Sequence, residues 1–257
     1  MPMSMTEIER ALRQLRLSGM RATLDARSLQ ATQGDLSFLD AFSSLLQDEL
    51  DRRTSRQIDR AFTLSGLPEE RKTLQDFDWH FNSKVPKKEC LELCALRFLR
   101  HGEDALLIGS PGTGKSHIAL AVAHAAILAG HRVVYREAHE IFPELYQATQ
   151  LGTRQKLMRH FTECDLLVLD DLFLRKLPAD APDELQEIVL NRYKRKKSTV
   201  VTTNRIADDW GKLLGDTVCA ATILDRLMHR GNLLRFEGKS YRLKEAAARL
   251  AREKHSV

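Results

Sequence analysis

Apolar residues in the amino-terminal quarter of the chain recur every three or four positions, the spacing that places them on one face of a helix. Ile8, Leu12 and Leu15 form a first set, and Phe38, Phe42, Leu45, Leu46 and Leu50 form a second. The segments LSGM (17–20) and TQGD (32–35) contain glycine and interrupt the periodic stretches. The pattern therefore predicts a small all-helical domain over residues 1–66.

The segment that follows, residues 64–89, has little regular spacing of apolar residues and contains two prolines. Both features are typical of a linking stretch rather than of a helix or strand. We interpret residues 67–90 as a connector between two domains.

From Leu91 onward, short apolar runs alternate with longer helical patterns. The runs 104–109, 132–136, 165–172 and 198–204 are predicted to be strands, and 90–99, 116–129, 138–148 and 183–197 are predicted to be helices. Strands separated by helices of this length form a parallel sheet that is covered on both faces. Residues 91–257 are therefore predicted to form a three-layer αβα domain.

Composition and targeting signals favour a cytoplasmic protein with no membrane partner. Of the 257 residues, 43% are hydrophobic and 29% are charged, which is enough for an ordinary buried core. No stretch approaches the roughly 18 to 20 consecutive apolar residues of a membrane helix, and the first residues do not resemble a secretory signal. The cysteines Cys90, Cys94, Cys164 and Cys219 show no metal-binding spacing, so we expect buried free thiols.

The net charge of +5 is unevenly distributed along the chain. Residues 1–65 contain nine Lys/Arg and nine Asp/Glu, whereas residues 226–254 contain nine Lys/Arg and three Asp/Glu. The segment RYKRKK (192–197) holds five basic residues in six. Either basic cluster could contact a nucleic-acid backbone, and either could be an ordinary solvated helix face.

The sequence GSPGTGKS (109–116) lies between a predicted strand and a predicted helix, the context in which a glycine loop binds phosphates. Glycine allows successive N–H groups to turn toward one phosphate, a lysine reaches the β and γ phosphates, and the serine hydroxyl is a ligand for Mg²⁺. The predicted nucleotide-binding residues are Gly109, Ser110, Pro111, Gly112, Thr113, Gly114, Lys115, Ser116 and His117. The connector could wrap the nucleotide base as well as link the domains.

Polar residues at the ends of two other predicted strands complete the candidate site. Asp170 ends the apolar run LLVLDDL, where a carboxylate can hold Mg²⁺ beside the phosphate loop. Asp171 is a candidate for polarising the attacking water, although an aspartate there could simply cap the next segment. Asn204 follows the run VVTT and could reach the γ-phosphate or its water, or could form a turn.

Several nucleotide-binding classes do not fit the sequence. A GTP switch would carry an Asn-Lys-x-Asp base reader, and NRIADD (204–209) does not match it. The signature of an ABC-type ATPase follows its phosphate loop, whereas the similar LSGLP (64–68) precedes it here. A small-molecule kinase would have an arginine-rich lid, for which Arg154, Lys156 and Arg159 are weak support.

The order GSPGTGKS, LLVLDDL, TTN, ILDRLMHR and GKSYR resembles the IstB-like helper ATPases of bacterial insertion sequences, in the IstB and DnaC clade of the AAA+ ATPases. The resemblance covers nearly the whole chain. It implies an AAA+ core with a five-stranded parallel sheet, ATP and Mg²⁺ as cofactors, and rings or spirals on double-stranded DNA with ATP at the subunit interfaces. It also implies a cognate transposase as partner, and a helical domain that takes part in assembly and DNA contact.

The resemblance assigns two further residues, Arg226 and Arg242. Arg226 in LDRL occupies the position of the arginine finger, which reaches the γ-phosphate of a neighbouring subunit, and Arg242 in SYR occupies that of the second sensor, which acts within its own subunit. Arginine suits both tasks because its planar guanidinium binds phosphate oxygens in pairs and stays charged. Only fifteen residues follow Arg242, so we expect a neighbouring subunit to cover much of the nucleotide.

Three functions are open on these grounds. The first is a transposition helper ATPase that assembles on DNA and recruits or stimulates a transposase. The second is a replicative helicase loader of the DnaC type, in which the early helices would grip a helicase. The third is a phosphate-loop enzyme that does not act on DNA, such as a kinase.

Overall fold

The protein is described from a computed structural model that covers residues 3–34 and 36–254. The chain divides into two compact units, Met1–Ala61 and Phe62–Val257. Asp35 of the predicted break, and residues 1–2 and 255–257 at the ends of the predicted domains, lie outside the described residues.

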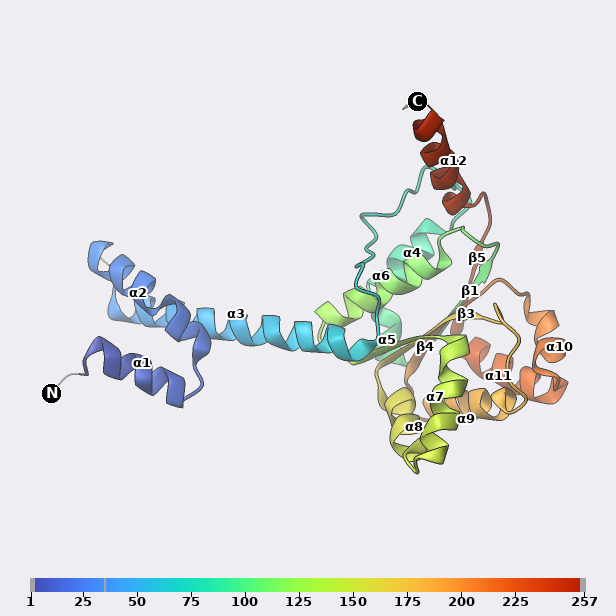
Figure 1. Cartoon of the computed structure of the whole chain (residues 1–257), viewed down its shortest axis with the longest axis horizontal. Helices are drawn as coiled ribbons and strands as arrows, with labels where there is room; N and C mark the ends of the chain where they lie inside the picture. Colours follow the sequence, from blue (N-terminus) through green and yellow to red (C-terminus); the bar gives the residue numbers. More distant parts are fainter. Residues whose placement is uncertain (1–2, 35, 255–257) are drawn as a thin grey trace. The chain divides into compact units, whose positions relative to one another are not determined.

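The first unit is all-helical, as predicted. It consists of α1 (Met5–Gln14), α2 (Ser18–Gln33) and most of α3 (Phe38–Ser65), the last turn of which belongs to the second unit (Figure 1). Glu49 is buried in this unit and accepts hydrogen bonds from the backbone N–H groups of Gly19 (2.5 Å) and Met20 (3.3 Å). Its carboxylate therefore caps the start of α2, where helix N–H groups have no partner within the helix.

The apolar stripe predicted from residue 38 onward lies on α3, but much of it is exposed. Phe38, Phe42, Leu46 and Leu50 are all exposed, and the rings of Phe38 and Phe42 stack with their centroids 5.9 Å apart. The helical spacing thus predicted the secondary structure correctly, whereas these four side chains are not buried by the part of the chain that the structure describes.

The second unit is built on a five-stranded, all-parallel sheet with the order β2-β3-β4-β1-β5. The strands are β1 (Asp104–Gly109), β2 (Val133–Glu137), β3 (Leu166–Leu172), β4 (Ser198–Thr203) and β5 (Gly231–Phe236). β1, β3 and β4 are buried over most of their length; β1 and β3 have largely apolar sequences, whereas β4 also buries Ser198, Thr199, Thr202 and Thr203. The predicted α/β architecture is confirmed.

Helices cover both faces of this sheet (Figure 1). On one face α6 (Lys115–Leu128) packs on β1, β3 and β4, with α4 (Lys87–Cys94) against it. On the other face lie α7 (Ala138–Gln150), α8 (Arg154–Glu163), α9 (Ala181–Lys194) and α11 (Thr217–His229). The remaining helices are α5 (Arg97–His101), the short 3₁₀ helix η1 (Ala207–Asp209), α10 (Trp210–Leu214) and α12 (Tyr241–Lys254).

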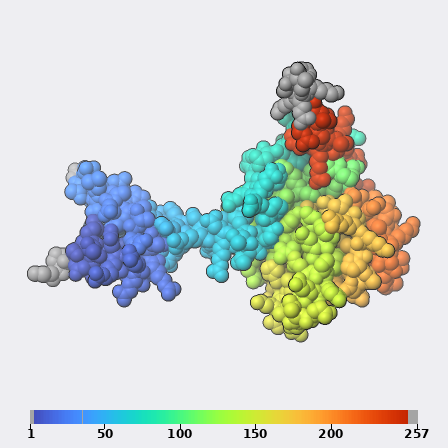
Figure 2. Space-filling view, in the orientation of Figure 1, coloured from blue at the N-terminus to red at the C-terminus, as the bar shows by residue number. Residues whose placement is uncertain are grey.

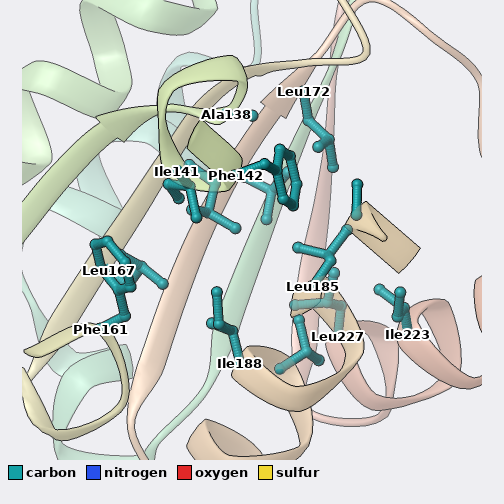
Figure 3. Close-up of a cluster of buried hydrophobic side chains, with 14 of the residues drawn as sticks. Ala138, Ile141, Phe142, Phe161, Leu167, Leu172, Leu185, Ile188, Ile223 and Leu227 are labelled. Carbon is teal, nitrogen blue, oxygen red and sulfur yellow. The ribbon is translucent and has the colours of Figure 1, made fainter. Parts of the chain in front are cut away.

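A large apolar cluster fills the space between the sheet and α7, α8, α9 and α11 (Figure 3). Phe142 and Phe161 enter it from α7 and α8, Ile188 from α9, Ile223 from α11, and Leu167 from β3. Apolar residues of this size each contribute roughly 1.5–3 kcal/mol when fully buried. The cluster therefore fixes the strands whose carboxyl ends carry the candidate site.

One predicted helix is divided in two. The pattern predicted a helix over residues 90–99, but α4 ends at Cys94 and α5 begins at Arg97. Leu96, between them, has a φ of 61°, in the left-handed region that a residue with a side chain seldom adopts. A helix cannot pass through that conformation, and the spacing of apolar residues does not reveal it.

The basic segment 192–197 is only partly a surface feature. Arg192 is 1% exposed, and its guanidinium donates to the backbone oxygens of Phe161 (2.7 Å), Cys164 (3.1 Å) and Ser198. Lys197 forms an ion pair with Asp165 at 2.7 Å. Arg192 therefore ties α8 and α9 to the start of β4, and this part of the cluster serves the core rather than an outside partner.

The cysteine thiols are free, as predicted. Cys90, Cys164 and Cys219 are buried and Cys94 is half-buried. Burial raises the pKa of Cys90 to about 12, so this thiol stays protonated and unreactive. Among the described residues, no helix is both long enough and apolar enough to cross a membrane.

Candidate functional site

The sheet brings the three predicted segments to one edge. β3, β4 and β1 are adjacent and parallel, so their carboxyl ends lie side by side. The glycine loop follows β1, Asp170 and Asp171 lie near the end of β3, and Asn204 follows β4. In open parallel sheets ligands bind at this edge, where the strand order reverses.

The glycine loop adopts a conformation that requires glycine at two central positions. Gly112 has a φ of 75° and Gly114 a φ of 104°, both in the left-handed region. A Cβ atom on Gly112 would lie 2.1 Å from Ser240 Oγ, and one on Gly114 would lie 2.4 Å from a ring carbon of Phe77. The loop then leads directly into α6, whose first N–H groups and dipole favour an anion at this point.

Lys115 is the buried cation of the loop. It is 5% exposed, and its ammonium donates to the backbone oxygens of Gly109 (2.8 Å) and Ser110 (2.9 Å). Burial lowers the pKa of Lys115, while the nearby carboxylates of Asp171 and Asp170 oppose this effect. The amine is therefore held at the loop in a setting where a phosphate would favour its charged form.

A cavity of about 410 Å³ opens beside the loop, a volume typical of small-molecule sites. Its lining contains every predicted loop residue from Pro111 to His117, together with Asp171, Asn204 and Arg242. Among the described residues, Gly109, Ser110, Asp170 and Arg226 are not part of this lining. The structure thus brings most of the predicted site residues around one cavity.

The two aspartates differ sharply in their surroundings. Asp170 is 4% exposed, and its two carboxylate oxygens accept hydrogen bonds from Tyr135 Oη (2.8 Å) and from the Thr202 hydroxyl. Asp171 has a φ of 53°, and its backbone N–H donates to Thr202 Oγ1 (2.9 Å). Burial and the neighbouring carboxylate of Asp170 raise the pKa of Asp171. The unusual backbone turns Asp171 toward the cavity, while Asp170 is held firmly beneath it.

Asn204 has an unpaired polar atom beside the cavity. Within the described part of the chain, its buried side-chain Oδ1 accepts no hydrogen bond. A buried acceptor without a donor costs free energy, roughly 1–3 kcal/mol.

The two predicted arginines occupy different places. Arg242 lies in the first turn of α12 and lines the cavity. Arg226 lies on α11, outside the lining, with its side chain 38% exposed and its guanidinium 3.1 Å from a carboxylate oxygen of Asp225. Its guanidinium carbon is 5.1 Å from the ring centroid of Tyr193, over which Arg230 also lies at 4.5 Å. This stacking gives Arg226 a defined direction at the surface.

The connector forms part of the wall of the cavity. The sequence alone left open whether this segment wraps the nucleotide or only links the domains. Its lining residues are Lys72, Asp76, Phe77, Asp78, Phe81 and Asn82. The backbone oxygen of Thr73 is 2.7 Å from His117 Nε2, and the rings of Phe77 and His117 meet edge to face with centroids 5.2 Å apart. The aromatic residues clustered in this otherwise polar stretch are the feature of the sequence that could have indicated its place in the cavity wall.

A sequence model of the IstB-like ATP binding proteins matches residues 10–249. The chain belongs to this family. It is 34% identical over 94% of its length to an ATP-binding protein in an insertion sequence of Mycobacterium tuberculosis, of which the match covers 96%. A similar protein of insertion sequence IS21 in Pseudomonas aeruginosa is 33% identical, with 94% of this chain and 90% of the relative covered.

The solved structures show the same fold. The DnaC helicase loader superposes with a TM-score of 0.52 at 23% identity, covering 62% of this chain and 98% of the loader. The predicted AAA+ core is thereby confirmed, and so is the resemblance to IstB-like proteins. ATP binding is a property of this family, and the family occurs in insertion sequences.

Proposed function

We propose that this protein is an ATPase that assembles on double-stranded DNA and helps a cognate transposase act at target DNA. One observation carries the proposal. In a chain of an insertion-sequence ATP-binding family, the glycine loop, Asp171, Asn204 and Arg242 all line a single cavity. Such a set is what phosphoryl transfer needs, because that reaction depends on positioning and on neutralising charge.

Each residue has a proposed task in ATP binding and hydrolysis. The loop amides and Lys115 bind the phosphates, and Asn204, which lines the cavity, orients the attacking water through its side-chain amide. Asp171 lines the cavity and polarises that water. Arg242 binds the phosphates from its own subunit.

Ser116 and Asp170 are proposed to hold Mg²⁺. Hydroxyl and carboxylate oxygens are the donors that this ion prefers, and the ion usually keeps several waters. Asp170 fits an outer role, since it is buried beneath the cavity with its orientation fixed by Tyr135 and Thr202. When bound, Mg²⁺ neutralises charge on the phosphates.

Arg226 is proposed to complete the site of a neighbouring subunit. It lies outside the cavity of its own chain, exposed on α11 and directed by Tyr193. The exposed stripe of Phe38, Phe42, Leu46 and Leu50 supports assembly, because apolar surface of this kind marks contact sites. We therefore propose a homo-oligomer, a ring or spiral with ATP at its subunit interfaces.

The proposed division of labour follows the chain. Residues 1–66 form a domain for assembly and DNA contact, 67–90 the connector, and 91–257 the ATPase domain. The basic stretch 226–254 supports contact with the DNA backbone, as does the occurrence of the family in insertion sequences. A cytoplasmic location, where the DNA is, belongs to the same proposal.

Mixing two inactive variants tests the shared site. Arg226→Ala keeps an intact cavity but contributes no arginine to the neighbouring subunit. Lys115→Ala contributes its arginine but does not bind phosphate in its own cavity. Each is expected to lose DNA-stimulated ATP turnover alone. An equal mixture should regain up to about a quarter of wild-type turnover, since one interface in four then pairs an intact cavity with an intact arginine.

The matched control is Arg159→Ala, which removes an exposed arginine of α8 away from the cavity. It should leave turnover unchanged. A mixture no more active than its two components would refute the shared site, and an Arg226→Ala variant with full turnover would remove Arg226 from the reaction.

A further inference from the structure

The connector and the start of α12 are held together at the rim of the cavity. Asn82 is 7% exposed, and its side-chain amide donates to the backbone oxygen of Lys239 (2.8 Å). The backbone N–H of Lys239 donates in return to Asn82 Oδ1 (2.9 Å). A side chain that pairs with both polar groups of one distant residue acts like a short piece of β-ladder, and it fixes the backbone just before α12.

Gly238 shows how close this contact is. A Cβ atom at this position would lie 2.4 Å from Asn82 Oδ1, and the φ of Gly238 is 134°. The backbone of residue 238 can approach Asn82 only without a side chain.

A second contact lies one turn along α12. Lys244 Nζ is 2.9 Å from Asp78 Oδ2 and lies 4.6 Å and 4.8 Å from the ring centroids of Phe81 and Tyr241. The two rings meet edge to face at 5.3 Å. The ammonium is thus placed by a carboxylate and two aromatic faces together, which restricts it more than an isolated surface ion pair would. In Figure 2 the red residues of α12 adjoin the turquoise connector.

Arg242 lies between these two contacts. It is three residues after Lys239 and two before Lys244, and the adjacent Tyr241 donates its backbone N–H to Gly112 O of the glycine loop (2.9 Å). The first turn of α12 is therefore tied to the loop on one side and to the connector on the other. Arg242 itself is in an exposed position at the cavity. Its direction depends on how firmly this turn is held.

We propose that Asp78 and Asn82 are positioning residues for Arg242. Both also line the cavity, and the role assigned to them is to act on bound ATP through this arginine, by holding the first turn of α12 over the glycine loop. The proposal rests on the role of Arg242 in ATP binding proposed above. It adds that the affinity for ATP is set in part by the connector, a segment that carries none of the phosphate-binding motif.

The test measures the affinity of the full-length protein for a fluorescent ATP analogue, without DNA or transposase. Asp78→Asn and Lys244→Met should each weaken binding by roughly three- to fivefold, the range of a partly exposed ion pair. Asn82→Ala should weaken it by roughly tenfold, because it removes two buried hydrogen bonds. Lys244→Arg keeps the charge and the contact with the rings, and it should bind nearly as wild type does.

The decisive measurement repeats Asp78→Asn in an Arg242→Ala background. If Asp78 acts through Arg242, the second substitution removes the effect of the first, and the two losses do not multiply. Equal losses in both backgrounds would overturn the proposal, and so would an Asp78→Asn variant that binds as wild type does. Lys84→Met is the matched control, because Lys84 pairs with Glu237 at 3.8 Å across the same two segments but is largely exposed.

The outcomes also separate this proposal from the function on which it rests. If Arg242→Ala itself leaves binding unchanged, the role of Arg242 fails, and the positioning role fails with it. If Arg242→Ala weakens binding but Asp78→Asn and Asn82→Ala do not, only the positioning role is wrong. Thermal melting of each variant confirms that the loss occurs in folded protein, and Lys244→Met remains informative if Asn82→Ala unfolds.

Discussion

Replacing Arg192 with methionine should destabilise the ATPase unit without acting on DNA directly. The substitution removes the guanidinium but keeps an unbranched apolar side chain in the same space. Three backbone oxygens, those of Phe161, Cys164 and Ser198, then lose a buried donor. At about 1 kcal/mol for each buried acceptor left unpaired, the loss is roughly 3 kcal/mol.

Part of this loss is offset by the charge that methionine no longer buries. Arg192 is 1% exposed, and burial lowers its pKa, which shows that the fold disfavours the charge itself. We therefore expect a net loss of about 2–3 kcal/mol, a large fraction of the 5–15 kcal/mol by which domains are typically stable.

Urea unfolding monitored by tryptophan fluorescence measures this loss, since Trp210 is fully buried in the second unit. The midpoint of Arg192→Met should fall well below that of the wild type. Lys194→Met is the control, because Lys194 is an exposed residue of the same helix. Its free energy of unfolding should change by no more than about 0.5 kcal/mol.

DNA binding distinguishes the two interpretations of the basic segment. In the absence of urea, where Arg192→Met and Lys194→Met are both folded, Arg192→Met should bind duplex DNA with the affinity and salt dependence of the wild type. An unchanged unfolding midpoint, combined with weaker DNA binding and a smaller salt slope, would refute the reasoning and make Arg192 a phosphate contact after all.

Three further predictions concern the buried acids and DNA. Burial raises the pKa of Asp104 to about 6, so the folded state binds its proton more tightly than the unfolded chain does. Stability should therefore fall by roughly 2–3 kcal/mol as pH rises from below 4 to above 6. Asp104→Asn keeps an acceptor for the Thr199 N–H, and its urea midpoint should vary less over this range; equal pH slopes would contradict this. Asp170→Asn should lower steady-state ATP turnover by about a hundredfold, which corresponds to about 3 kcal/mol in the activation free energy. Near-normal turnover of this variant would exclude Asp170 from the reaction. Affinity for duplex DNA of any sequence should fall steeply with salt in a fluorescence-anisotropy titration, and a flat response would count against backbone contact.

The elements that the sequence predicted well are those whose evidence is local. The apolar run 104–109 indicated a buried strand because parallel strands covered on both faces are rich in apolar residues, and the β-branched residues of 198–204 indicated another. The glycine loop was recognisable because its residues and its place between strand and helix coincide. Parallel strands also end at one edge, so Asp171 and Asn204 were correctly expected near the loop.

Features that depend on distant contacts were not predictable. Tyr135 and Thr202 hold Asp170, but each looks like an ordinary strand residue until the register of β2, β3 and β4 is known. Arg192 looks like one more basic residue of a surface cluster, since only the fold places three carbonyl oxygens around it. The left-handed backbone at Leu96 likewise leaves no mark in the apolar pattern.

The connector shows why a segment without a motif can still matter for the reaction. It follows α3, the helix that runs from the helical unit into the second unit, and several of its residues between Lys72 and Asn82 line the cavity. Phe77 packs against Gly114, and the Thr73 carbonyl contacts His117, so the segment that follows α3 is in contact with the phosphate loop. Any rearrangement of that loop must move or strain the connector, because side chains packed this closely shift only together. On the proposed function, ATP and the DNA-contacting domain are therefore joined by the backbone itself, before any second subunit is added.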